Sequence, residues 1–170
     1  VAIIWVVEVV NWVLGHSLNG LGIGPRSITG LTGLVTAPFL HAGPWHALSN
    51  TFPLLVFGYL LSVRSVERFI RVSLYITVLG GAAVWLFGRG AVHVGASGLV
   101  FGLFGYLLAA AWYERSPAAI GSAVVVVLLY GGLVWGLVPS AGVSVESHIF
   151  GLLVGAWLAR VDVKSGVIKH

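Results

Sequence analysis

The chain has 170 residues, of which 58% are hydrophobic and 8% are charged, and it contains no cysteine. A water-soluble domain carries roughly a quarter charged residues. This composition therefore argues against a soluble enzyme and a disordered chain, and the lack of cysteine excludes disulfides and thiolate chemistry. We expect an all-α membrane protein with most of its chain in lipid.

Six stretches are apolar enough to cross a bilayer, for which a helix needs about 20 residues. In chain order they are 1–14, 45–63, 69–87, 97–113, 118–138 and 148–161. The fourth and sixth are short, and we interpret the whole chain, 1–170, as one polytopic domain. The long first loop, about 15–44, is too apolar for a flexible linker, so we expect it to be partly embedded in the outer leaflet.

The positive charges predict the orientation in the membrane. Of the nine lysines and arginines, all but Arg26 and Arg89 fall on one side of a six-span arrangement. Cytoplasmic loops are enriched in Lys and Arg, so we expect both termini on the cytoplasmic side of a bacterial-type cell membrane. This distribution accounts for the net charge of +4, and we expect no nucleic-acid partner.

Polar residues gather at the outer ends of three predicted helices. With both termini inside, the second, fourth and sixth spans all run from outside to inside. Their first turns contain His46 and Asn50, then Ser97, then His148. Polar groups within membrane helices are costly and are candidates for function. We therefore expect an active site toward the outer face.

Small residues predict that the fourth and sixth spans pack closely. Gly98 and Gly102 lie four apart in one span, and Gly151 and Gly155 lie four apart in the other. This spacing lets helix backbones approach in lipid. Because His148 lies three residues before Gly151, it shares the glycine face and is expected beside Ser97.

A serine beside a histidine is the minimum for nucleophilic catalysis. Glu67, Glu114 and Asp162 are predicted at the cytoplasmic end, and Glu146 points away from His148 on a helix. We therefore expect a Ser-His dyad without an acidic third member. The first position of a helix favours negative charge, so Ser97 is also suited to an oxyanion.

The ordered motifs resemble those of the rhomboid family of intramembrane serine proteases. They are His41-x-x-x-x-His46-x-x-x-Asn50, Gly95-Ala96-Ser97-Gly98 and His148-x-x-Gly151-x-x-x-Gly155. The resemblance implies a six-helix core and hydrolysis of peptide bonds in or near transmembrane segments of protein substrates. It implies no cofactor and no metal.

The resemblance also implies roles for single residues. Ser97 matches the nucleophile and His148 the general base, while His46, Asn50 and the Ser97 amide match the oxyanion hole, supported by Gly95. The remaining matches imply structural packing, and they are His41, Gly98, Gly102, Gly151, Gly155 and Phe101. Phe101 is a departure, because many members have a tyrosine there, stacked on the histidine.

Three other interpretations are open. The main alternative is a catalytically inactive rhomboid-like protein that binds transmembrane clients, although such relatives usually lose the serine or the histidine. A haem or metal protein is disfavoured, because His41 and His46 are five apart and Pro44 lies between them. A transporter would show repeats or broken helices, and none is visible in the sequence.

Overall fold

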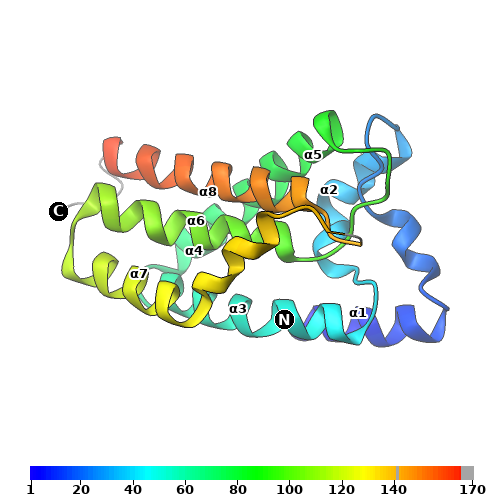
Figure 1. Ribbon diagram of the computed structural model, residues 1–170, viewed down its shortest axis with the longest axis horizontal. Helices are drawn as coiled ribbons and strands as arrows, with labels where there is room; N and C mark the ends of the chain where they lie inside the picture. Colours follow the sequence, from blue (N-terminus) through cyan, green and yellow to red (C-terminus); the bar gives the residue numbers. More distant parts are fainter. Residues whose placement is uncertain (141, 166–170) are drawn as a thin grey trace.

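The computed structural model describes residues 1–140 and 142–165, which are mostly helical (Figure 1). Residues 141 and 166–170 of the predicted domain lie outside the described part. Four long helices stand alone: α1 (Ala2–Val13), α3 (Pro44–Ser62), α6 (Ser97–Glu114) and α8 (Val145–Lys164). Helix α4 (Val66–Tyr75) continues through the π turn η4 (Ile76–Gly80) into α5 (Gly81–Phe87). Helix α7 (Pro117–Tyr130) continues as the 3₁₀ segment η5 (Gly131–Leu137). Each predicted span thus has a helical counterpart.

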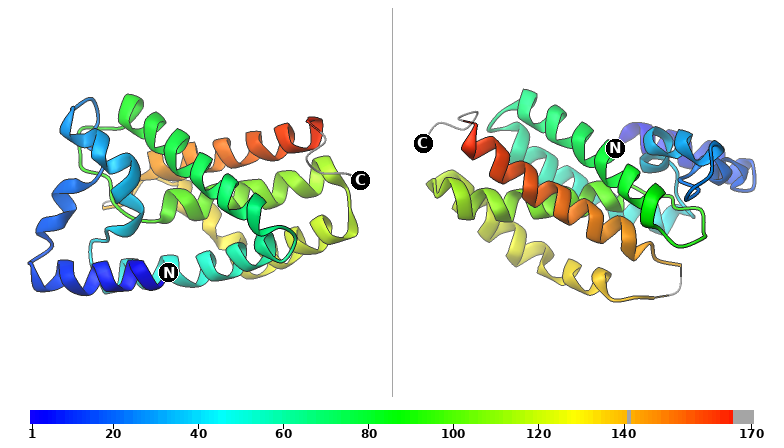
Figure 2. Two further views of the ribbon diagram at one scale, coloured as in Figure 1. Left: turned by 180° about the vertical axis from the view of Figure 1, so that it is seen from behind. Right: turned by 90° about the horizontal axis from the view of Figure 1, so that it is seen from above.

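The connection between α1 and α3 is structured rather than extended. It consists of short helical turns, η1 (Ser17–Leu21), η2 (Thr29–Thr32), α2 (Gly33–Thr36) and η3 (Ala37–Phe39). With α1, this connection forms one end of the molecule (Figure 2). Thr36 and Trp85 help to hold it in place, because the Thr36 hydroxyl donates to the Leu21 carbonyl and the Trp85 indole donates to the Ser27 carbonyl.

The last helix is longer than the sequence predicts. It begins at Val145 because Ser144 caps it, the Ser144 hydroxyl accepting a hydrogen bond from the Ser147 amide. His148 therefore lies within the first turn of a 20-residue helix rather than at its start. The His148 side chain is buried.

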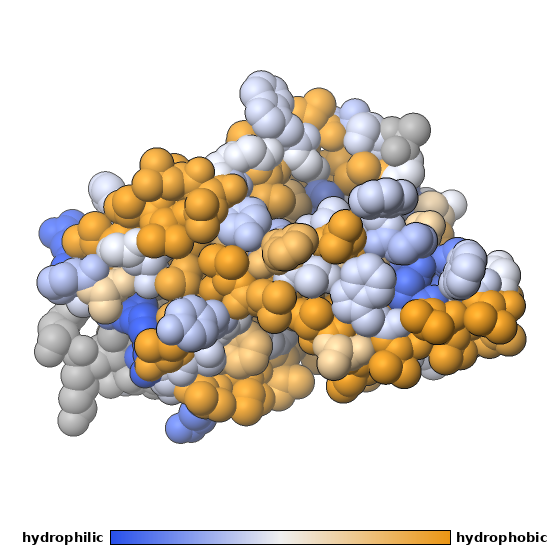
Figure 3. Space-filling view, turned by 90° about the horizontal axis from the view of Figure 1, so that it is seen from below, coloured by the Kyte–Doolittle hydropathy of each residue, from blue (hydrophilic) through white to orange (hydrophobic). Residues whose placement is uncertain are grey.

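Large apolar side chains cover much of the outer surface (Figure 3). Among the residues that the structure describes, two helical stretches are long and apolar enough to cross a membrane, Val66–Phe87 and Pro117–Leu137, and Ala2–Val13 is a shorter apolar helix. The exposed apolar residues include Val13, Phe87 and Leu128, each more than two-thirds exposed. Such a surface is stable only against another apolar medium.

The centre of the molecule is the contact between α6 and α8, which run side by side (Figure 1). The predicted glycines lie at this contact. A Cβ atom on Gly151 would overlap the Gly98 carbonyl, and one on Gly155 would overlap the Gly102 carbonyl. The two backbones therefore touch, as small residues allow.

Buried charges join the helices at the end where α6 finishes. The Arg71 guanidinium lies 2.7 Å from the Asp162 carboxylate, which also accepts from the Tyr106 hydroxyl at 2.7 Å. Nearby, Arg64 pairs with Glu114. Glu114 and Asp162 thus lie at the end opposite Ser97, where the sequence predicts them.

Candidate active site

The three helices with polar first turns begin at the same end of the molecule. α3, α6 and α8 all run from the end formed by α1 and the first loop toward the other end (Figure 1). His46 and Asn50 lie in α3, Ser97 begins α6 and His148 lies in α8. The structure therefore brings together residues that are up to 102 positions apart in the chain (148 − 46).

The loop before Ser97 is held by main-chain hydrogen bonds. The Gly95 amide donates to the Ala37 carbonyl at 2.9 Å, and the Ala96 amide donates to His41 Nε2 at 3.3 Å. Gly95 has φ +115°, and a Cβ atom there would lie 2.8 Å from His46 Nε2. Only glycine allows both the conformation and the close approach of His46.

Ser97 occupies the first position of α6. An amide at this position has no acceptor within its own helix. Its N–H and its hydroxyl therefore both belong to a helix N-terminus, which favours negative charge.

His148 is held from two directions. Its ring stacks on Phe101, with centroids 4.1 Å apart and an interplanar angle of 7°. Its Nδ1 lies 2.7 Å from the Gly136 carbonyl oxygen, at the end of η5. The stacking expected at Phe101 is therefore present without a phenol hydroxyl.

His46 and Asn50 present polar atoms from successive turns of α3. The Ala42 amide donates to His46 Nδ1 at 3.3 Å, and Asn50 Nδ2 donates to the His46 carbonyl at 3.0 Å. The rings of His41 and His46 meet edge to face, with centroids 5.0 Å apart.

These side chains surround a cavity of about 620 Å³. Its lining includes the predicted polar residues His46, Asn50, Ser97 and His148, together with Ser49, Phe101, Leu133 and Gly136. Within residues 1–140 and 142–165, no hydrogen bond joins Ser97 to His148. Catalytic hydrogen bonds are often long before substrate binds, so the shared cavity is the relevant geometry.

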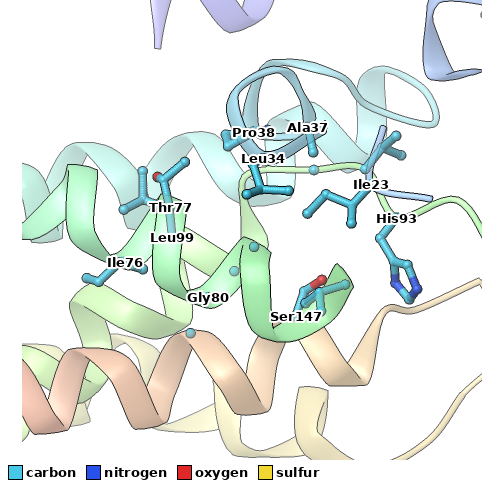
Figure 4. Close-up of a pocket in the computed structure, with 16 residues that line it drawn as sticks. Ile23, Leu34, Ala37, Pro38, Ile76, Thr77, Gly80, His93, Leu99 and Ser147 are labelled. Carbon is cyan, nitrogen blue, oxygen red and sulfur yellow. The ribbon is translucent and has the colours of Figure 1, made fainter. Parts of the chain in front are cut away.

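A second cavity, of about 40 Å³, lies on the other side of the α6 N-terminus (Figure 4). His93 and Ser147 line it. His93 Nδ1 is 2.6 Å from the Ser144 hydroxyl, which is 2.6 Å from the Ser147 hydroxyl. This chain of bonds ties the loop before α6 to the start of α8.

The acid nearest in sequence to His148 is engaged elsewhere. The Glu146 carboxylate lies 3.6 Å from Arg89 Nε and accepts a bond from the Arg89 amide. Glu146 therefore contacts the loop at Arg89. Among the described residues, no group of three or more histidine, aspartate or glutamate side chains is arranged to hold a metal ion.

His41 is fully buried beside the loop that precedes Ser97. Burial, reinforced by the neighbouring His46, lowers the pKa of His41 to about 4. The neutral ring can accept the Ala96 amide hydrogen, and a doubly protonated ring could not. This contact fits the packing role implied for His41.

Comparisons with known proteins identify the family of this chain. Residues 29–165 match the model of the Rhomboid domain. The uncharacterised protein Rv1337 of Mycobacterium tuberculosis is 36% identical over 165 residues, covering 91% of this chain and 69% of its own length.

Two more distant relatives carry rhomboid names. YdcA of Bacillus subtilis, named as a candidate rhomboid protease, is 30% identical over 77% of this chain and 67% of its own length. RHOMBOID-like protein 6, mitochondrial, of Arabidopsis thaliana is 35% identical over 75% of this chain and 42% of its own length. Taken with the domain match over most of the chain, these similarities show that it belongs to the rhomboid family of polytopic membrane proteins.

Proposed function

We propose that the protein is an intramembrane serine endopeptidase that hydrolyses peptide bonds in or near transmembrane segments of membrane proteins. The observation that carries this proposal is the cavity shared by Ser97 and His148, with the far side of the His148 ring already bonded to Gly136. A serine and a histidine that come within hydrogen-bond reach of each other form the nucleophile and base of acyl transfer.

In the first half of the reaction, Ser97 Oγ attacks the substrate carbonyl carbon while His148 Nε2 takes the hydroxyl proton. The tetrahedral intermediate collapses when the imidazolium gives that proton to the leaving amine, and the carbon–nitrogen bond breaks. In the second half, water attacks the acyl-Ser97 ester, and His148 again accepts and then returns a proton. No other reactant is needed.

We assign the stabilisation of the intermediate's negative oxygen to three donors from residues that line the cavity. These are the Ser97 amide, His46 Nε2 and the second hydrogen of Asn50 Nδ2, whose first is bonded to the His46 carbonyl. Each such donor is worth roughly 3–4 kcal/mol in a water-excluded site. Gly95 supports this hole by letting His46 approach the loop.

The membrane setting follows from the same interpretation. The single domain crosses the bilayer six times, with both termini in the cytoplasm and the cavity toward the outer face. Its partners are the lipid bilayer and transmembrane substrates, and it uses no cofactor. The polar site thus meets a substrate segment where that segment leaves the hydrocarbon core.

Labelling with a fluorescent fluorophosphonate tests the nucleophile in the purified protein. We expect labelling of the wild type and of Ser49→Ala, whose hydroxyl lies in the same cavity, and none of Ser97→Ala. Cleavage of a single-span membrane protein should follow the same pattern. A folded wild type that neither labels nor cleaves would favour the alternative, an inactive family member that binds transmembrane clients.

A further inference from the structure

The proposed chemistry requires the two imidazoles that face the cavity to carry their hydrogens on different nitrogen atoms. His148 must present a lone pair on Nε2 to accept the Ser97 proton. His46 must present a hydrogen on Nε2 to stabilise the oxyanion. A neutral histidine carries one hydrogen on either nitrogen, so the two rings need different tautomers, and soluble serine proteases use a buried carboxylate to select the one that the base needs.

A carboxylate does not hydrogen-bond to either ring within the part of the chain that the structure describes. Glu146 is bonded to Arg89, and Glu8 is bonded to His16. The selection must therefore come from other groups that touch the two Nδ1 atoms.

The partner of His148 Nδ1 can only accept a hydrogen bond. It is the Gly136 carbonyl oxygen, at 2.7 Å. The bond therefore requires the hydrogen on Nδ1, which leaves a lone pair on Nε2. This is the tautomer of a general base.

The partner of His46 Nδ1 can only donate. It is the Ala42 amide, at 3.3 Å. Nδ1 must then hold the lone pair, so the hydrogen lies on Nε2. This is the tautomer of an oxyanion donor.

We infer that the Gly136 carbonyl and the Ala42 amide are positioning groups that fix opposite tautomers of His148 and His46 and so replace the missing acid. This inference rests on the proposed function. The requirement at position 136 is steric as well, because a Cβ atom there would lie 2.7 Å from Phe101 Cζ and 3.3 Å from His148 Nδ1. Gly136 lets the carbonyl, the stacked ring and the imidazole meet at one point.

Gly136→Ala and Gly131→Ala form a matched pair for the test. Both positions lie in η5, but Gly131 does not line the cavity, and a Cβ atom there would make only an ordinary contact, 3.9 Å from Val127 Cγ1. In protein labelled with ¹⁵N-histidine, we expect wild-type His148 to carry its hydrogen on Nδ1 and His46 to carry its hydrogen on Nε2. The signals are assigned by their loss in His148→Gln and His46→Gln.

Gly136→Ala should shift the His148 signal toward the other tautomer, leave the His46 signal unchanged, and slow Ser97 labelling about tenfold to a hundredfold. Loss of an orienting carboxylate costs about 10⁴-fold in a soluble protease, and a neutral acceptor should cost less. Gly131→Ala should match the wild type in every measurement. A wild-type tautomer and labelling rate in Gly136→Ala would overturn the inference.

A second pair of variants changes no side chain and covers the case in which Gly136→Ala does not fold. An ester in place of the amide between residues 136 and 137 weakens the Gly136 carbonyl as an acceptor, and an ester between 132 and 133 is its control. We expect slower labelling and an altered His148 signal only for the first. Equal effects of the two esters would overturn the inference, whereas an unreactive wild type would overturn the proposed function instead.

Discussion

Both ends of the α6–α8 pair contain buried polar side chains, and the two ends use them differently. At the end where α6 finishes, Asp162 accepts bonds from Arg71 and Tyr106 within 2.7 Å. At the end where α6 begins, Ser97 and His148 face a cavity of about 620 Å³ without bonding to each other. The groups around Asp162 are paired with one another, whereas Ser97 and His148 face open space.

The difference teaches how to interpret polar residues in a membrane helix. Such residues are expensive unless they are bonded. Where a carboxylate is bonded to the guanidinium and phenol that surround it, stability explains the cluster. Where polar atoms are oriented by the backbone but their reactive sides face open space, as at His148, stability does not explain the arrangement. We expect substitutions at the two ends to separate chemistry from folding.

The largest effect is expected at His148. In His148→Ala, Ser97 has no base, and hydrolysis and labelling should fall by about 10⁴-fold or more, as they should in Ser97→Ala. The double variant should be no worse than either single one, because the two side chains act as a unit. Rates measured beside thermal unfolding curves check this, with Arg160→Ala, an exposed position in the same helix, as the control. Losses that add in the double variant would contradict the dyad.

The opposite outcome is expected for Asp162→Ala. Removing the buried Asp162 carboxylate takes away a partner of the partly exposed Arg71 and of the buried Tyr106 hydroxyl. This should lower the free energy of unfolding by about 1–3 kcal/mol. The labelling rate per folded molecule should stay at the wild-type value. Arg160→Ala, an exposed position in the same helix, is the control. If Asp162→Ala were as stable as the wild type but no longer labelled, the distinction between a structural end and a catalytic end would be wrong.

Asn50→Ala refines the account of the cavity end. We expect a hundredfold or greater loss of hydrolysis rate, since one oxyanion donor is worth roughly 3–4 kcal/mol. Ser49→Ala is a close control, because the Ser49 hydroxyl also donates to the His46 carbonyl and also lines the cavity. A wild-type rate in Asn50→Ala, or an equal loss in Ser49→Ala, would remove Asn50 from the oxyanion hole.

The placement of different polar residues at the two ends could be predicted from the sequence, because it depends on the identity of side chains. The direction of the spans placed His46, Ser97 and His148 at one end. The glycine spacing placed α6 against α8, and it is confirmed by the contact of Gly151 with the Gly98 carbonyl. The family resemblance is confirmed by the domain match over residues 29–165.

The positioning groups could not be predicted in the same way. The Gly136 carbonyl and the Ala42 amide are main-chain atoms, and every residue has a carbonyl. Their importance depends on how η5 and the segment before α3 are placed beside the cavity. No side chain in the sequence indicates that placement. The start of α8 at Val145 was easier to predict from the sequence, because Ser144 is a residue type that caps helices.

Gly155→Val tests what the two ends share. A side chain there would collide with the Gly102 carbonyl, and overpacking of this kind costs about 1–3 kcal/mol or more. Because the α6–α8 contact supports both ends, unfolding temperature and labelling should fall together. Gly121→Val in α7, where a Cβ atom meets no atom within 4 Å, should change neither. Unchanged stability of Gly155→Val would contradict the close contact.

The smallest effect concerns acid and acts on the cavity end alone. With the pKa of His41 lowered to about 4 by burial, the unfolded chain takes up a proton near pH 6.5 while the folded chain does not. The stabilising contribution is therefore complete above pH 6.5 and is lost as the pH falls toward 4. One pKa unit corresponds to about 1.4 kcal/mol, so the loss by pH 5 is on the order of 1–2 kcal/mol.

Unfolding temperatures of wild type and His41→Gln between pH 8 and pH 4.5 measure this contribution. Glutamine can still accept the Ala96 amide hydrogen but does not titrate, so the variant should lose part of the acid sensitivity that the wild type shows. If His41→Gln and wild type weaken in parallel as the pH falls, the neutral ring beneath the Ser97 loop is not what acid disrupts, and the sensitivity of this end must arise in the cavity itself.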